Sequence, residues 1–395
     1  MSINRQILPA IVFAQFCCTS LWFAGNGIMQ DLLKTFDLAP AALGHLTSAV
    51  QFGFITGTLA FAFLTIADRF SPSKVFFYSA LFGALFNLGM TWEGNTAGSL
   101  LLLRFLTGFS LAGIYPVGMK IASDYYRKGL GTSLGFLVGA LVVGTAFPHL
   151  LRAFTGNEAL PWKLVLFITS ALAAFGGIII LLLVPDGPYR RPMLIKNFSA
   201  FISVFKIKEF RAAAFGYFGH MWELYAFWAF VPFILAMYKQ LHPNLSFDTS
   251  LMSFIVIGSG GIACVTGGFI SRRLGSKRTA ATALFLSGLC CLLSPLSLLQ
   301  SSVEILLIFL IFWGLVVVAD SPLFSTLVAK HAPEEARGTA LTIVNSIGFA
   351  ITIFSIQLLN FLSLQISHYY LFLFLAPGPV LGLYFLYRKR NATKL

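Results

Sequence analysis

Twelve long apolar runs constrain this chain of 395 residues more than any other feature of its sequence. Each run is about 20 residues long or longer, which is the length an α-helix needs to cross the hydrocarbon core of a bilayer. Hydrophobic residues make up 57% of the chain and charged residues 10%, and so low a charged fraction is not typical of a soluble domain. Only helices and closed barrels satisfy their backbone groups in lipid, and a barrel would show short alternating strands. The sequence therefore predicts an all-α membrane protein.

Charged residues, glycine and proline separate the predicted spans. In chain order the spans cover residues 7–33, 42–66, 75–92, 98–123, 130–152, 163–184, 211–238, 249–271, 278–299, 303–329, 338–362 and 367–387. The first apolar run is too long for the core of a signal peptide, so we expect it to be a retained helix.

The distribution of lysine and arginine predicts the topology. An even number of spans places both termini on one side, and the loops of that side hold most of the basic residues. The opposite loops hold only Lys34, Arg152, Lys163 and Lys239. The positive-inside rule then predicts cytoplasmic termini in a cell inner membrane. This accounts for the formal net charge of +13 without a nucleic-acid partner, and it adds a weak attraction to anionic lipid.

The two halves of the chain look like repeats of each other. The longest polar break begins at Pro185, so we expect an N-terminal six-helix bundle at 1–186, a cytoplasmic linker at 187–210 and a C-terminal six-helix bundle at 211–395. Three features recur about 204 to 207 residues apart. These pairs are Asp68-Arg69 with Arg272-Arg273, Tyr115-Pro116 with Ser321-Pro322, and Gly131-Thr132 with Gly338-Thr339.

Across essentially its whole length the chain resembles the major facilitator superfamily. Members of this family carry a Gly-x-x-x-Asp-Arg-x-Gly-Arg-Arg-like signature after helices 2 and 8 and an Arg-x-x-x-Gly motif in helix 4. Here Asp68-Arg69 and Arg104 with Gly108 match, whereas Arg272 stands where an acid is usual. The resemblance implies twelve helices in two bundles related by a pseudo-two-fold axis, with helices 1, 4, 7 and 10 around a central cavity.

The resemblance also implies a gate at the cytoplasmic side. It would be closed by ion pairs between the halves that involve Asp68, Arg69, Arg272 and Arg273. A plain positive-inside anchor explains Arg272 and Arg273 equally well, but it does not explain Asp68.

Ionisable residues inside a span cost about 2.5 to 3.5 kcal/mol each on insertion scales, so they need a function or a partner. His220 and Glu223 lie three residues apart in span 7 and share one helix face. Asp320 precedes Ser321-Pro322 in span 10, where the proline favours a bend. A carboxyl group beside an imidazole can take up and release a proton, so these three residues are candidates for proton coupling. The alternative is a structural role, as hydrogen bonds between helices or as a cap at the bend.

Candidate solute-binding residues lie in the spans expected to line the cavity. Arg104 stays charged, so it must pair either with an anionic solute or with an acid of the protein. The other candidates are Gln15, Trp22, Asn26, Tyr217 and Trp222. Arg104 favours an anion, and the aromatic residues favour a solute with an apolar body.

These observations predict a secondary transporter, not an enzyme, that moves a small organic solute, an anionic metabolite, by alternating access with H⁺ as the coupled ion. No cofactor, metal or nucleotide site is expected, since no phosphate-binding loop is present, and we expect a monomer. Two alternatives stay open, namely a proton-driven efflux antiporter for an amphipathic compound and a non-transporting sensor of the same fold. Uptake and efflux are not distinguished by the sequence.

Overall fold

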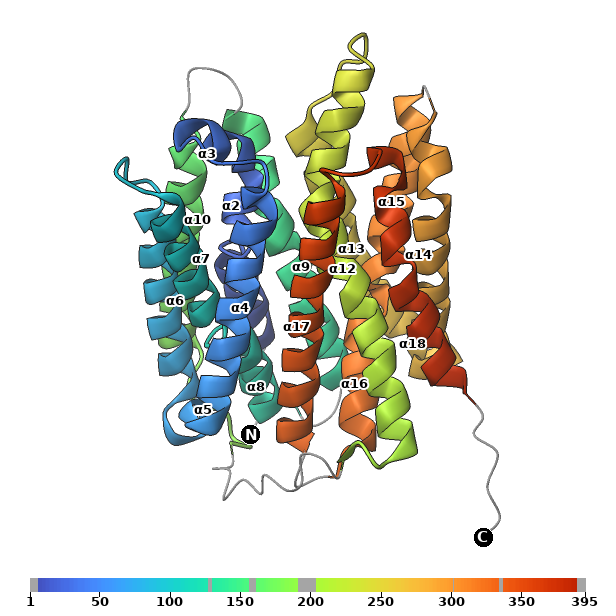
Figure 1. Ribbon diagram of the computed structural model, residues 1–395. Coiled ribbons are helices and arrows are strands. Elements are labelled where there is room, and N and C mark those ends of the chain that lie inside the picture. The colour runs from blue at the N-terminus through green and yellow to red at the C-terminus, as the bar shows by residue number, and fades with distance from the viewer. Residues whose placement is uncertain are drawn as a thin grey trace.

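The computed structural model describes residues 6–126, 130–155, 161–190, 204–300, 302–333 and 337–388, with the side chains at 130–131 and 337–339 left out. The described elements are helices, and they run roughly side by side (Figure 1). Much of the predicted linker, and several of the basic residues used for the topology, lie outside the described residues. These basic residues are Arg5, Arg127, Lys128, Arg191, Lys196, Lys389, Arg390 and Lys394, with the side chain of Arg337.

The first half of the chain forms the helices on one side of the molecule (Figure 1). They are α1 (Ile7–Thr19), α2 (Ala24–Gly27), α3 (Met29–Thr35), α4 (Ala42–Phe63), α5 (Ile66–Arg69), α6 (Pro72–Gly89), α7 (Ala97–Leu111), α8 (Tyr115–Tyr125), α9 (Leu130–Thr155) and α10 (Lys163–Leu183). One of the connections between them supplies a side-chain cap. Thr96 accepts a hydrogen bond from the Ser99 backbone N–H and begins α7 in a capping box.

The second half forms the other side. Its helices are α12 (Lys208–Leu241), α13 (Thr249–Leu274), α14 (Ser276–Leu298), α15 (Val303–Ala319), α16 (Ser321–His331), α17 (Arg337–Leu362), the 3₁₀ helix η2 (His368–Leu375) and α18 (Pro377–Tyr387). We call the end of the molecule where α5 and the start of α12 lie the linker end, and the opposite end, where α3 lies, the α3 end (Figure 1).

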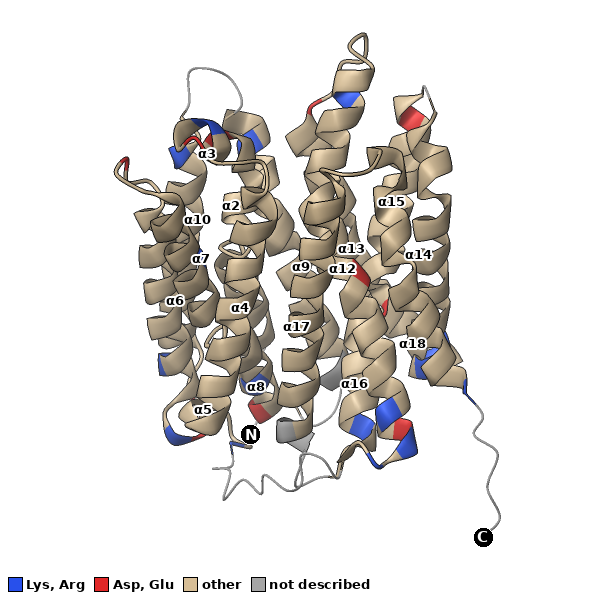
Figure 2. Cartoon of the chain, in the orientation of Figure 1, with Lys and Arg blue, Asp and Glu red and all other residues tan. Residues whose placement is uncertain are grey.

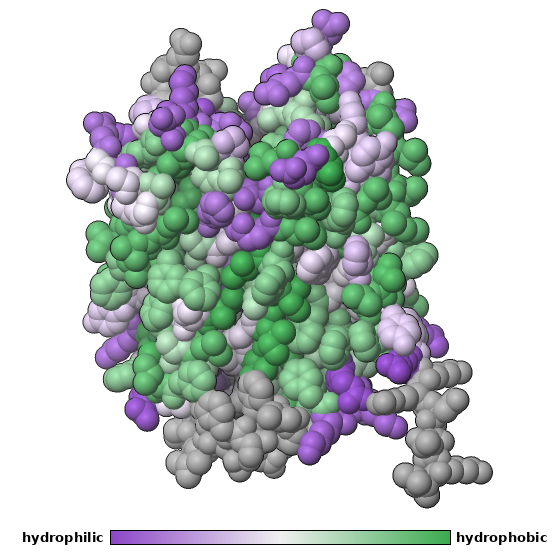
Figure 3. All heavy atoms as spheres, viewed as in Figure 1, coloured by the Kyte–Doolittle hydropathy of each residue, from purple (hydrophilic) through white to green (hydrophobic). Residues whose placement is uncertain are grey.

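Ten helices within the described residues are long and apolar enough to cross a membrane. The other two predicted spans are also helical. The third is α6, and the first is interrupted, because α1, α2 and α3 replace one continuous helix. Large apolar side chains such as Phe82, Leu182 and Ile308 are exposed around the outside. Figure 3 shows this apolar belt between polar ends, and Figure 2 shows most of the charged residues gathered at those ends. Such a surface is stable only in lipid.

Close glycine contacts repeat in the two halves. A Cβ at Gly108 of α7 would lie 2.0 Å from the Val50 carbonyl oxygen of α4, and a Cβ at Gly314 of α15 would lie 2.0 Å from the Val256 carbonyl oxygen of α13. Gly108 and Gly314 are 206 positions apart, within the offset that the repeated motifs predict. The two halves therefore pack their second and fourth spans in the same way, through residues small enough for the backbones to touch.

The fourth span of each half is broken directly before its repeated proline motif. α8 begins at Tyr115-Pro116 and α16 begins at Ser321-Pro322, and in each case the proline lies in the first turn of the new helix. Proline is tolerated at that position because the first N–H groups of a helix have no partner within the helix. The tenth span is thus interrupted directly before Pro322, where the sequence predicts a bend.

The halves meet along two helix pairs, α9 with α13 and α4 with α17. At the first crossing, a Cβ at Gly139 would lie 3.1 Å from the Gly261 carbonyl oxygen, and a Cβ at Gly261 would lie 2.6 Å from the Val143 side chain. Gly139 of span 5 therefore packs closely against the other half of the molecule.

Replacing Gly261 with leucine should lower the thermal stability of the protein, because the added side chain overlaps α9 at the crossing. Overpacking of this kind costs about 1 to 3 kcal/mol. The matched control is Gly268→Leu on the same helix, since no atom lies within 4 Å of a Cβ there. Thermal unfolding of both purified variants checks the prediction, and equal melting temperatures for the two would contradict it.

Candidate functional site

An aromatic cluster occupies the centre of the interface between the halves. Trp22 stacks on Phe349 with ring centroids 5.6 Å apart and lies 5.8 Å from Tyr225, while Phe54 lies 4.5 Å from Phe349. These residues come from the α1–α2 connection, α4, α12 and α17, and all four are buried. The cluster therefore joins both bundles where a solute path between them would run.

Arg104 holds the interruption of the first span. Its guanidinium, on α7, donates a hydrogen bond of 3.1 Å to the Leu21 carbonyl oxygen and another to that of Trp22. These carbonyls follow the end of α1, where a cation is favoured by the helix dipole. The arginine is buried, and its Nε has no hydrogen-bond partner among the described residues. The sequence predicted an acid or an anionic solute as its partner, whereas within the described residues its partners are backbone carbonyls.

The hydrogen bonds of the other candidates in the first span stay within the first half of the protein. Asn26 donates to the Thr47 hydroxyl at 2.8 Å, and Trp22 donates to the Gln51 side chain at 3.3 Å. Gln15 is buried, and its amide has no hydrogen-bond partner among the described residues. These groups stay candidates for solute binding, but in this conformation they do not line an open pocket.

The three candidates for proton coupling lie in the second half and form two separate arrangements. His220 Nδ1 lies 2.8 Å from an Asp320 carboxylate oxygen, and both side chains are buried. Glu223 accepts hydrogen bonds from the Ser287 hydroxyl at 2.8 Å and from the Trp313 indole at 2.6 Å. The pairing of His220 with Glu223 suggested by their spacing is therefore not formed. The imidazole instead contacts an acid 100 positions away in the sequence.

Asp320 lies between α15 and α16, at the break before Pro322. Its carbonyl oxygen accepts the backbone N–H groups of Leu323 and Phe324, so the residue is fixed at the start of α16. The contact with His220 therefore connects α12 to the one point where the tenth span is interrupted.

Tyr217 and Trp222 lie on different faces of α12. The Tyr217 ring is 5.9 Å from the His220 ring and lies beside the interface pocket. Trp222 donates instead to the Phe374 carbonyl oxygen of η2 at 3.1 Å and contacts Gly378 of α18. Trp222 does not line the pocket between the halves.

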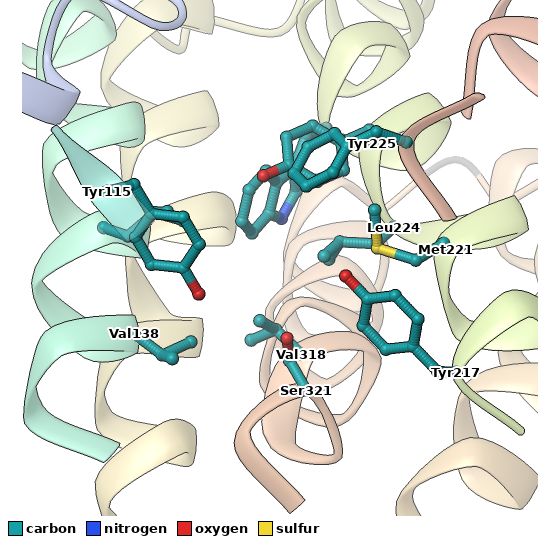
Figure 4. Close-up of a pocket in the computed structure, with 11 residues that line it drawn as sticks. Tyr115, Val138, Tyr217, Met221, Leu224, Tyr225, Val318 and Ser321 are labelled. Atoms are coloured by element: carbon teal, nitrogen blue, oxygen red, sulfur yellow. The ribbon is translucent and has the colours of Figure 1, made fainter. Parts of the chain in front are cut away.

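That pocket lies between α8 and α9 of the first half and α12, α15, α16 and α17 of the second (Figure 4). The lining residues are Tyr115, Val138, Leu141, Tyr217, Met221, Leu224, Tyr225, Trp228, Val318, Ser321 and Phe349. Sequence reasoning missed Tyr115 and Ser321 as lining residues. The available signal was their position, since each stands directly before a repeated proline.

The predicted gate residues lie at the linker end. Lys120 contacts the Asp68 carboxylate at 3.2 Å and Asp124 at 3.5 Å, so the ion pair of Asp68 is formed within the first half. Arg272 of α13 donates to the Thr132 hydroxyl of α9 and crosses between the halves. Within the described part of the chain, Arg69 and Arg273 form no ion pair.

Comparison with known proteins extends these observations. The family model described as Major Facilitator Superfamily matches residues 11–356 and 213–394. Among curated relatives, the 4-hydroxybenzoate transporter PcaK of Pseudomonas aeruginosa is 25% identical over 173 residues, which cover 43% of this chain and 37% of PcaK. The probable galactarate/D-glucarate transporter GudP of Escherichia coli is 28% identical over 172 residues, which cover 41% of this chain and 38% of GudP.

The chain matches less than half of the length of these curated relatives. The solved structure of the human organic anion transporter MFSD10 (TETRAN) superposes on this chain with a TM-score of 0.76 at 14% identity. The superposed region covers 97% of this chain and 99% of the MFSD10 chain. At this identity the likeness establishes the fold.

The two repeated bundles, the broken fourth and tenth spans and the family match across the chain lead to one conclusion: this protein belongs to the Major Facilitator Superfamily.

Proposed function

We propose that the protein is a proton-coupled secondary transporter that moves a small organic anion across the cell inner membrane by alternating access, with both termini in the cytoplasm. The observation that carries this proposal is the buried contact between His220 and Asp320, 2.8 Å long, at the break of the tenth span. It lies beside the pocket between the halves, because Ser321 and Tyr217 line that pocket.

The arrangement couples a proton to helix position as follows. The attraction between His220 and Asp320 depends on the protonation of both groups, and it holds α12 against the start of α16. When a proton binds to either group or leaves it, this attraction changes. The distance between α12 and the start of α16 then changes with it. Glu223 lies one turn further along α12 and is held by two neutral donors, so within the described residues it is a carboxyl group without a cationic partner.

The contacts between the halves support a conformation closed at the α3 end. There the Gln357 amide donates to the Ser48 hydroxyl at 2.7 Å, and the Asn360 amide donates to the Ala41 carbonyl oxygen at 3.1 Å. At the linker end Asp68 pairs with Lys120 of its own half. In the opposite conformation, we propose, Asp68 leaves Lys120 and pairs with Arg272 or Arg273 of the other half, which closes the linker end beside Arg69.

Charge supports an anionic solute. Arg104 is a buried cation, and its hydrogen-bond acceptors among the described residues are neutral backbone carbonyls. Its positive charge is therefore not paired with an acid among those residues. It lies directly behind Trp22, whose ring contacts the pocket residues Tyr225 and Phe349. The relatives PcaK and GudP are named as a 4-hydroxybenzoate transporter and a probable galactarate/D-glucarate transporter. These solutes are organic anions, and this supports an anionic solute.

The variants Glu223→Gln and Asp320→Asn should each abolish accumulation of the solute driven by a pH gradient, yet leave solute exchange without a gradient measurable. The amide side chains keep the shape of the acid but cannot release a proton. Uptake and counterflow in proteoliposomes measure the two activities. Glu304→Gln is the control, since Glu304 is exposed at the α3 end of the same half. Unchanged accumulation in both variants would remove these acids from the coupling role.

The variant Arg104→Ala should weaken the binding of an anionic solute several-fold more than the binding of a neutral analogue of the same shape. The reason is the loss of an uncancelled positive charge near the pocket. Arg104→Lys keeps the charge but not the fork that grips two carbonyls, so it should retain most of the preference for the anion. Equal losses for the anion and the neutral analogue in Arg104→Ala would show that the arginine acts only by holding the α1–α2 connection.

A further inference from the structure

The pocket between the halves contains no charged side chain among its lining residues. Its walls are aromatic and aliphatic, with Tyr225, Trp228 and Phe349 supplying ring surfaces. A sugar acid or polyol needs many paired donors and acceptors, and neither an amide nor a carboxylate side chain lines this pocket. The wall chemistry therefore favours a solute with a planar apolar body, because ring-on-ring contacts add attraction beyond the burial of apolar area.

The polar groups of the pocket can all donate hydrogen bonds. Tyr115 from the first half and Tyr217 from the second point their hydroxyls into the space between them (Figure 4). The Trp228 indole N–H, which can only donate, is buried and has no hydrogen-bond partner among the described residues. A buried unpaired donor that borders a pocket indicates a ligand with an acceptor.

The two tyrosines belong to different halves of the molecule. Tyr115 begins α8, and Tyr217 lies on α12, one turn before His220. A group with two acceptor oxygens can take one hydrogen bond from each hydroxyl, and in doing so it joins the two bundles. A carboxylate has this geometry, and hydrogen bonds to a charged acceptor are the stronger kind.

We infer that this pocket binds the carboxylate of a planar aromatic acid, with one oxygen on the Tyr115 hydroxyl and the other on the Tyr217 hydroxyl, and with the ring against Tyr225, Trp228 and Phe349. The inference rests on the proposed function and names the class of its substrate. Because Tyr217 adjoins His220 and Ser321 adjoins Asp320, the bound carboxylate lies next to the proposed proton pair. Neutral donors bind the anion directly, and Arg104 contributes only through its field.

Binding of benzoate to the purified protein, measured by isothermal titration without any ion gradient, tests the inference. The comparison ligands are cyclohexanecarboxylate, which has the same charge on a puckered ring, and phenyltrimethylammonium, an aromatic cation that an aromatic cage would also fit. We expect benzoate to bind most tightly, cyclohexanecarboxylate several-fold more weakly and the ammonium not measurably. Tighter binding of the ammonium than of benzoate, or no binding of benzoate, would overturn the assignment.

The variants Tyr115→Phe and Tyr217→Phe remove one hydroxyl each and keep the ring. Each should weaken benzoate binding about tenfold or more, the usual effect of losing a hydrogen bond to a charged group. Tyr78→Phe is the matched control, because Tyr78 is exposed on α6. Thermal unfolding without ligand verifies that the variants fold. Benzoate affinity within twofold of the unsubstituted protein in both variants would overturn the inference.

This binding experiment is independent of proton coupling. If benzoate fails to bind but acid-dependent accumulation of another organic anion is found, the substrate class is wrong and the proposed transport stands. If benzoate binds through the tyrosines but Glu223→Gln and Asp320→Asn leave accumulation unchanged, the substrate class stands and the proposed coupling is wrong.

Discussion

The centre of this protein depends on the hydrogen bonds that Arg104 donates to the carbonyl oxygens of Leu21 and Trp22. A continuous first helix would satisfy those carbonyls itself and would leave the arginine a buried cation without partners, which lipid and protein both disfavour. The interruption between α1 and α2 supplies the acceptors, and it also places Trp22 in the aromatic cluster between the halves. One charged residue therefore fixes both the path of the first span and the closure of the interface.

The second half uses charge in a different way. Its buried ionisable groups pair with one another or with neutral donors, and the contact between His220 and Asp320 lies where the tenth span is broken. In the first half the corresponding break precedes Tyr115 and carries no acid. The repeat thus provides the same break twice, and the two copies have different chemistry: one presents a tyrosine hydroxyl to the pocket and the other presents an acid that contacts a histidine. In the proposed mechanism, this asymmetry links a solute on one side of the interface to a proton on the other.

Much of the fold follows from local sequence. The lengths of the apolar runs predict the helices, and Pro322 predicts the break in the tenth span, because proline has a fixed backbone angle and lacks an N–H. The interruption of the first span was not predicted. Residues 20–23 are mostly apolar and look continuous in the sequence, and the reason for the break is a side chain more than 80 positions away.

The partners of the candidate residues were harder to predict. Spacing along α12 suggested that His220 and Glu223 pair with each other, whereas their partners lie on α14, α15 and the start of α16. Trp222 could not be assigned to a face either, since apolar residues surround a helix that contacts lipid on one side and protein on the others.

The proposed proton-coupled mechanism can be tested directly. When benzoate is added to proteoliposomes that contain a pH-sensitive dye, the interior pH should change faster and further than in protein-free vesicles. Saturable benzoate entry with a pH change no larger than that of the protein-free vesicles would contradict the account.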